Sequence, residues 1–198
     1  MNIVYLLLYA IAVVVVGFVM VKTYLEKDIM NRKVLISLTL TMICIVSYSV
    51  NFMTDNYNIM SAATSIMMVA QDFLLVTLFI YTTAFTRIRN KATKVMTIAS
   101  FALALVDSVV FIVNIFNEIA LKYSLVKCDG IYVLGYEGEL WFGIHAVMSM
   151  LIVAFIIAVL VIKCIRIPSA YWGRYIVMAA GLVFIVLIKY VFIYKIID

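Results

Sequence analysis

The sequence is poor in charge, proline and histidine. Only 13% of its 198 residues are charged, and it has one proline and one histidine. A soluble domain carries about a quarter charged residues. Here the hydrophobic fraction is 68% and the mean hydropathy is +1.21, which is more apolar surface than a water-facing fold can bury. These proportions exclude an ordinary soluble domain and predict an integral membrane protein.

Motifs of soluble enzymes and nucleotide-binding proteins are also missing. The chain has no glycine-rich phosphate loop, no His-Glu-x-x-His and no Gly-x-Ser-x-Gly. Its cysteines lie at three different depths, with Cys44 in the middle of a predicted span, Cys164 near the inner surface and Cys128 in the outer loop, so no pair is well placed for a disulfide. One histidine and scattered cysteines argue against a transition-metal site. We therefore expect no cofactor, no metal and no catalytic residue, and we do not read the net charge of +5 as a nucleic-acid patch.

Six apolar runs are each long enough to cross a bilayer as a helix, which takes roughly 20 residues. They are continuously apolar rather than alternating, which excludes the strands of a membrane barrel. The predicted spans are Asn2–Tyr24, Lys33–Met53, Ser61–Thr86, Val95–Asn117, Trp141–Ile165 and Tyr175–Ile197. The chain is thus predicted to be a single all-α membrane domain, residues 1–198, folded as a six-helix bundle.

The basic residues gather in the connections on one side of the predicted bundle. Most of the fifteen Lys and Arg residues lie there: Lys22, Lys27, Arg32, Lys33, Arg87, Arg89, Lys91, Lys94, Lys163, Arg166 and Arg174. Cytoplasmic loops carry such an excess. We therefore expect the N-terminus to lie outside the cell, in a multi-pass protein whose other partners include membrane lipids.

The one long connection, Glu118–Leu140, lies on the opposite, extracellular side. It holds two β-favouring runs, Tyr123–Val126 and Ile131–Leu134, on either side of Asp129–Gly130. Asp-Gly favours the tight two-residue turn of a hairpin. We predict a small extracellular β-hairpin between the fourth and fifth helices, over the outer end of the bundle.

Several polar side chains lie inside the predicted spans, where an uncompensated charge costs about 3 kcal/mol or more. Asp72 and Asp107 fall near the middle of the membrane, and Asn114 shares a helix face with Asp107. His145 lies one turn inside the fifth span, below Trp141, and Lys189 lies in the outer half of the sixth. We expect these groups to face inward and to line a polar cavity that opens outward. The candidate ligand-binding residues are Asp72, Asp107, Asn114, Trp141, His145 and Lys189.

A purely structural interpretation of the same residues stays open. Lys189 would then pair with Asp72 or Asp107 and tie helices together. His145 would make an interfacial hydrogen bond. Asn114, like Gln71 and Asn51, would form hydrogen bonds between helices.

The segment Tyr136–His145, Tyr-Glu-Gly-Glu-Leu-Trp-Phe-Gly-Ile-His, resembles the entry to the fifth helix in the N-terminal seven-helix sensor region of bacterial histidine kinases and diguanylate cyclases. The preceding hairpin, the Ile167–Tyr175 turn and the order and spacing of all six spans are similar to that family too. The resemblance covers essentially the whole chain.

The resemblance implies a sensory input domain of the bacterial plasma membrane, which binds an unknown small extracellular or membrane-borne ligand. The family's partner is a cytoplasmic kinase or cyclase module, acting as a dimer and joined after a seventh helix. Because the sequence ends at Asp198, after the sixth span, we expect that helix and the output enzyme to be absent from this chain. A truncated product and a stand-alone relative are both open interpretations.

Two other classes of function remain. The first is a small transporter or channel component that uses Asp72, Asp107 and Lys189 as its pathway, although no span is broken at mid-depth and no inverted repeat is visible. The second is a membrane enzyme built on His145 and the acidic residues, for which the sequence offers no second nucleophile and base.

Overall fold

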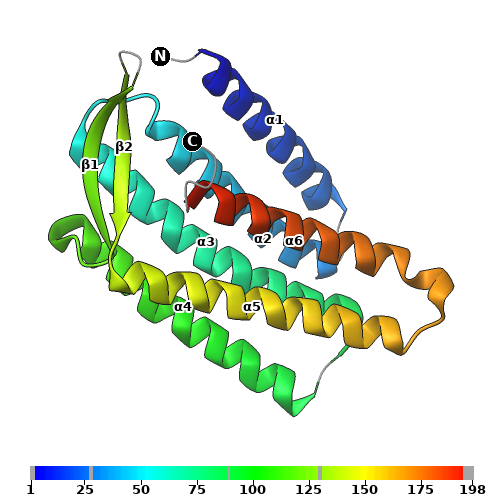
Figure 1. Ribbon diagram of the computed structural model, residues 1–198. Coiled ribbons are helices and arrows are strands. Elements are labelled where there is room, and N and C mark those ends of the chain that lie inside the picture. The colour runs from blue at the N-terminus through cyan, green and yellow to red at the C-terminus, as the bar shows by residue number, and fades with distance from the viewer. Residues whose placement is uncertain (1–2, 27–28, 89, 129–130, 194–198) are drawn as a thin grey trace.

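The computed structural model describes residues 3–26, 29–88, 90–128 and 131–193, with side chains in 6–26, 31–88, 90–124, 135 and 137–183. The described chain is a bundle of long helices with one hairpin at an end (Figure 1). Its elements are α1 (Ile3–Leu25), α2 (Ile29–Val50), α3 (Tyr57–Thr86), α4 (Lys91–Asn117), β1 (Leu121–Cys128), β2 (Ile131–Gly138), α5 (Leu140–Ile165), a short 3₁₀ turn at Ser169–Tyr171, and α6 (Gly173–Ile193).

Five helices in the described part of the chain are long and apolar enough to cross a membrane, namely α1 to α5. In α6, the portion with described side chains, Gly173–Val183, is a shorter apolar helix. These lengths and compositions fit an all-α, multi-pass membrane domain. The predicted sixth span, Tyr175–Ile197, extends beyond the described residues, which end at Ile193.

The third helix lies at the centre of the bundle. α3 packs against α2, α4 and α5, whereas α1 packs mainly against α2 and α6 against α5. The hairpin stands at the end where α4 stops and α5 starts (Figure 1). We call this the hairpin end. The far end holds the α3–α4 and α5–α6 connections.

Several helices begin earlier than their apolar runs suggest, because polar side chains cap them. α3 starts at Tyr57 rather than Ser61, since the Asn56 side chain accepts hydrogen bonds from the backbone N–H groups of Asn58 and Ile59. α4 starts at Lys91 rather than Val95. Asn90 and Thr93 there form a reciprocal capping box, in which each side chain binds the other residue's backbone N–H.

The two strands of the hairpin are antiparallel, with Leu121 opposite Gly138 and Cys128 opposite Ile131. They contain the predicted runs and extend beyond them at the base. The predicted turn residues, Asp129 and Gly130, lie outside the described residues. At the base, the Glu139 N–H donates to the Ala120 carbonyl at 3.0 Å, so the end of α4 and the start of α5 are held together.

Two apolar clusters form the core. The hairpin-side core lies between α3, α4, α5 and β1, and consists of Met60, Met68, Phe111, Ala120, Leu121, Tyr123 and Phe142. The far-side core lies between α3, α4, α5 and α6, and consists of Val76, Phe79, Ala104, Ile152, Ile156, Val159, Leu160, Tyr175 and Leu182. A polar layer separates the two.

Candidate functional site

Three helices each place one ionisable side chain in the layer between the two cores. These are Asp72 on α3, Asp107 on α4 and His145 on α5, and their exposed fractions are 5%, 1% and 1%. Each is flanked along its helix by one residue of each core. The three triplets are Met68, Asp72 and Val76; Ala104, Asp107 and Phe111; and Phe142, His145 and Ile152. The ionisable groups are therefore enclosed by apolar packing above and below.

Asp107 connects α4 to α5 through contacts with two side chains of α5, Trp141 and His145. Its Oδ1 accepts from the Trp141 indole Nε1–H at 2.8 Å, and its Oδ2 lies 2.6 Å from His145 Nδ1. The same imidazole nitrogen lies 3.3 Å from Asp72 Oδ1. One carboxylate on α4 and one on α3 thus converge on a single atom of α5. We call Asp72, Asp107, Trp141 and His145 the polar cluster.

The imidazole ring is confined by two aromatic rings. Phe111 meets it edge-on with centroids 5.0 Å apart, and Phe142 stacks against it at 6.0 Å. Such contacts fix the orientation of a ring in a packed core. Because the walls around His145 are apolar, the charges of the cluster are not screened by water, and electrostatic interactions within it are strong.

A close contact connects the base of the hairpin to this ring. Gly138, the last residue of β2, lies so near Phe142 that a Cβ atom at Gly138 would lie 2.5 Å from the Phe142 ring. Only glycine permits that approach. Phe142 in turn stacks on His145. A displacement of β2 at its base would therefore press on the ring that holds the imidazole.

Asn114 lies elsewhere and makes a different set of bonds. It is fully buried, and its Oδ1 accepts from the backbone N–H groups of Ala120 and Leu121 at 2.6 and 3.0 Å, while its Nδ2 donates to the Leu121 carbonyl at 3.2 Å. The chain reverses just after α4 at Glu118, whose φ is 49°. Asn114 thus fastens the start of β1 to the end of α4.

The other polar residues from the sequence are placed as follows. The side chain of Lys189 lies outside the described residues, so its predicted pairing with Asp72 or Asp107 does too. Asn51 donates to Thr64 Oγ1 at 3.2 Å and so bonds the end of α2 to α3. Asp72, Asp107, Trp141 and His145 come together, whereas Asn114 serves the hairpin.

Sequence reasoning did not identify the roles of Gly138, Phe142 and Phe111. Each belongs to a residue type that is ordinary in a membrane helix or a turn. Gly138 and Phe142 lie four residues apart on either side of the boundary between loop and helix. A glycine at that spacing before a bulky ring is the sequence signal that could have indicated close packing of the backbone against the ring.

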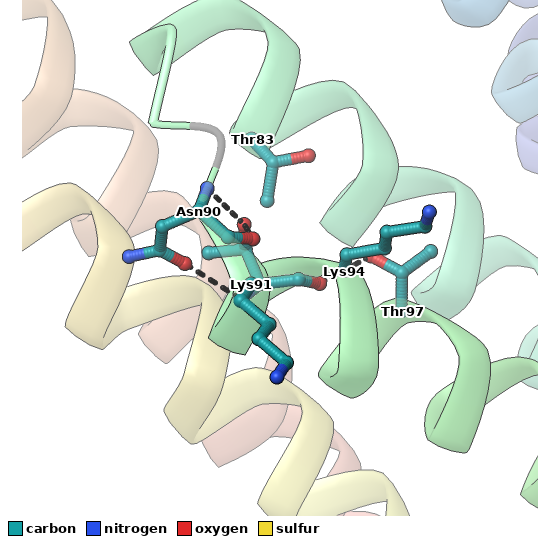
Figure 2. A pocket seen from close by; sticks show the side chains of 6 residues that line it. Thr83, Asn90, Lys91, Lys94 and Thr97 are labelled. Carbon is teal, nitrogen blue, oxygen red and sulfur yellow. Dashed lines mark hydrogen bonds between the residues drawn. The ribbon is translucent and has the colours of Figure 1, made fainter.

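An open cleft of about 490 Å³ lies at the far end, between α3 and the start of α4. Figure 2 shows its lining, including the capping box of Asn90. The lining residues are Thr83, Asn90, Lys91, Thr93, Lys94 and Thr97. Thr83 is eleven residues beyond Asp72 on α3, a rise of about 16 Å, so the cleft is separate from the polar cluster.

Outside the spans, Lys122 and Tyr123 of the hairpin have shifted pKa values. The Lys122 ammonium pairs with Glu139 at 2.5 Å, and this hydrogen-bonded pairing raises the pKa of Lys122. Tyr123 points into the bundle, with its hydroxyl 3.4 Å from Ser65 Oγ, and burial raises the pKa of Tyr123. The hairpin is therefore attached to α3 as well as to α4 and α5.

Comparison with known proteins gives one family. The sequence model of the N-terminal 7TM region of histidine kinase matches residues 5–198. No curated protein and no solved structure matches the chain. The match spans nearly the whole sequence, including every residue of the polar cluster.

Proposed function

Because this chain belongs to the family of N-terminal seven-transmembrane regions of histidine kinases, we propose that it senses a stimulus for such a kinase and that the polar cluster converts the stimulus into a change of helix packing. The matched region is the membrane sensor part of these enzymes. The stimulus is a small extracellular or membrane-borne ligand, and the output is a dimeric cytoplasmic histidine kinase or diguanylate cyclase module.

The orientation we propose places the hairpin end outside a bacterial plasma membrane. Described basic residues, among them Lys22, Arg87 and Arg174, lie near the ends of helices away from the hairpin. The excess of Lys and Arg in short connections favours a cytoplasmic location for that end. The hairpin and Trp141 then lie on the side that an external ligand reaches first.

The observation that carries the proposal is the meeting of α3, α4 and α5 at one imidazole. Asp72 and Asp107 both lie within 3.3 Å of His145 Nδ1. In a membrane, where apolar helices gain little from packing on each other rather than on lipid, such polar contacts strongly influence how helices associate. A change in these bonds would therefore alter the relative positions of three helices.

The route from outside to the cluster passes through the base of the hairpin. A ligand that shifts β2 moves Gly138 against Phe142, and Phe142 lies on the imidazole of His145. Trp141 offers a second route, since its indole binds Asp107 directly. The ligand favours one packing only by the difference in its affinity for the two, so it must contact groups that move.

The test separates signalling from folding. The chain is reconstituted in nanodiscs together with its histidine kinase module, joined to it or supplied as a separate partner. Trp141→Phe there removes one hydrogen bond to Asp107 but keeps an aromatic ring. We expect it to change basal histidine autophosphorylation by at least about tenfold, which corresponds to about 1.4 kcal/mol in the packing equilibrium. Thermal unfolding of the same preparation measures stability alongside.

Trp172→Phe is the matched control, because the Trp172 indole is at the far end and donates only to the Ile167 carbonyl. We expect autophosphorylation to stay unchanged in this variant. The proposal is wrong if Trp141→Phe alters stability and expression but leaves the signalling output of the folded protein at the wild-type level.

A further inference from the structure

We propose that the polar cluster binds one divalent transition-metal ion, with Asp72, Asp107 and His145 as its protein ligands. The binding site stands on geometry alone, whereas its role in signalling rests on the proposed function. The inference assigns a chemical class to the ligand of the sensor. It also reverses the expectation from the sequence, where a single histidine argued against a metal.

The donor set suits such an ion. One donor atom from each of the three residues lies within 4.8 Å of the other two. Two carboxylates and an imidazole are ligands of Zn²⁺ and of neighbouring divalent metals. Because the residues come from three different helices, no sequence spacing could reveal the set.

The distances are close to those of a loaded site. With metal bonds of ~2.0 Å, two ligand atoms of a tetrahedral ion lie about 3.3 Å apart. His145 Nδ1 and Asp72 Oδ1 are 3.3 Å apart, and His145 Nδ1 and Asp107 Oδ2 are 2.6 Å apart. Entry of the ion requires the contact between His145 Nδ1 and Asp107 Oδ2 to open by about 0.7 Å.

Charge gives an independent reason. Two carboxylates and one imidazole are buried between apolar cores. When both carboxylates are ionised, even a protonated imidazole leaves one negative charge in excess within this trio, and buried charge without compensation is costly. A divalent cation neutralises both carboxylates at once and leaves the imidazole neutral, which is the form that coordinates metals.

One carboxylate oxygen of Asp72 accepts no hydrogen bond from the described residues. Among the described residues its Oδ2 has no hydrogen-bond partner, although the side chain is only 5% exposed. Buried carboxylate oxygens without a partner are rare. A cation coordinated by both carboxylate oxygens of Asp72 would satisfy Oδ2 in the same place where the excess charge lies.

The surroundings resemble the outer shell of a metal site. Trp141 donates to the Asp107 oxygen that does not face His145. Hydrogen bonds of this kind orient ligating carboxylates. Phe111 and Phe142 form apolar walls beside the imidazole, and such walls limit the access of water to the metal.

Direct measurement on the wild-type chain needs no variant. The full chain in nanodiscs is stripped with a chelator, equilibrated with buffered free Zn²⁺, freed of excess metal and analysed by mass spectrometry and X-ray absorption. We expect about one zinc per chain, with nitrogen and oxygen neighbours at about 2.0–2.2 Å and an imidazole signature. The melting temperature should rise with free Zn²⁺ concentration. A chain that retains no zinc, and whose melting temperature ignores it, overturns the inference.

Variants then identify the ligands. Asp72→Asn and His145→Gln should each lower zinc retention at least tenfold. Asp55→Asn, at an exposed carboxylate outside the helices, should retain it fully. Retention of zinc by both Asp72→Asn and His145→Gln places the metal elsewhere and overturns the assignment.

The outcomes for metal and for signalling are distinguishable. If zinc does not bind but Trp141→Phe changes autophosphorylation, the metal inference fails and the sensory proposal stands. If zinc binds as expected but Trp141→Phe changes only stability, the metal site stands and the sensory role of the cluster fails. Zn²⁺-dependent autophosphorylation in the wild type, lost in His145→Gln, supports both.

Discussion

Helices α1 and α3 are both long and apolar, but different interactions hold them in the bundle. No residue in the membrane-spanning portion of α1 is buried, whereas half of the corresponding portion of α3 is. α1 packs mainly on α2, where Tyr9 contacts Tyr48 and Phe52 through rings 5.5 and 5.7 Å apart. α3 contacts three helices and carries Asp72 into the polar cluster.

The difference shows what positions a helix within a membrane. The apolar surface of α1 is equally satisfied by lipid, so hydrophobicity alone does not specify its neighbours. A buried carboxylate in a membrane needs polar partners, and among the described residues His145 contacts both Asp72 and Asp107 while Trp141 donates to Asp107. Polar groups therefore specify the arrangement of α3, α4 and α5, whereas α1 is held at the edge by aromatic packing.

The largest expected effect comes from removing Asp107. Asp107→Ala deletes the acceptor for both Trp141 and His145. Breaking a buried charged pair typically costs about 3–5 kcal/mol, and we expect a loss of that size in reversible unfolding in detergent. The same substitution at Asp55, which is exposed, should stay within about 0.5 kcal/mol. Equal losses in the two variants would contradict a special role for the cluster.

A smaller effect is expected at Asn114. Asn114→Ala leaves the Ala120 and Leu121 backbone groups buried without their present partner, at a cost of about 1–3 kcal/mol for an unsatisfied group. Hydrogen exchange should accelerate at the start of β1 while the middle of α3 stays protected. Asn117→Ala, on the exposed face of the same helix end, is the control. Uniform acceleration along the chain would show that the hairpin does not open as a local unit.

A matched pair of valines measures the contrast between α1 and α3 directly. Val76 is 1% exposed on α3 and Val14 is 70% exposed on α1. Val76→Ala should cost about 1 kcal/mol, because it removes methyl groups from a packed core. Val14→Ala should cost less than about 0.5 kcal/mol. Similar losses in unfolding experiments would mean that α1 is packed more tightly, for instance against a second chain.

The smallest effect is expected for the ion pair on the hairpin. Glu139 raises the pKa of Lys122, so the pair contributes fully below the ordinary lysine value of 10.5 and its contribution is lost as pH rises through the raised pKa. Both side chains are exposed, so the contribution is small and salt screens it. Lys122→Ala should leave unfolding nearly unchanged at neutral pH. A large destabilisation there would show that the pair is less exposed in the membrane.

The sequence predicted the membrane class and the apolar segments that form α1 to α5. It also singled out four residues that meet in the polar cluster, whose ligand-binding role stays a prediction. Composition and run length suffice for the first two, because burial in lipid demands them. The depth of Asp72, Asp107 and His145 along their helices was also accessible, since the rise per residue is constant. Whether the residues would face each other was not, because helices can rotate about their axes and only packing fixes that rotation.

Asn114 illustrates the limit. Its spacing from Asp107 suggested one shared face and one shared role, yet it lies at the end of α4 where the backbone leaves the helix. The chain reversal at Glu118 leaves the backbone N–H groups of Ala120 and Leu121 without a helical partner, so they donate to the Asn114 side chain. This reversal could not be predicted from the sequence. The helix starts at Tyr57 and Lys91 were missed for a similar reason, since the capping residues Asn56 and Asn90 were taken for loop.

The closed base of the hairpin has a consequence for changes in the length of this connection. Since Glu139 binds Ala120 across the base and Asn114 holds Leu121, the spacing between α4 and α5 is set before the strands extend outward. The segment beyond the base can then be lengthened, shortened or substituted without moving those helices. Each doubling of its length adds only about 0.6 kcal/mol to the free energy of loop closure. We therefore expect insertions or deletions beyond the base of the hairpin to leave the spacing between α4 and α5 unchanged.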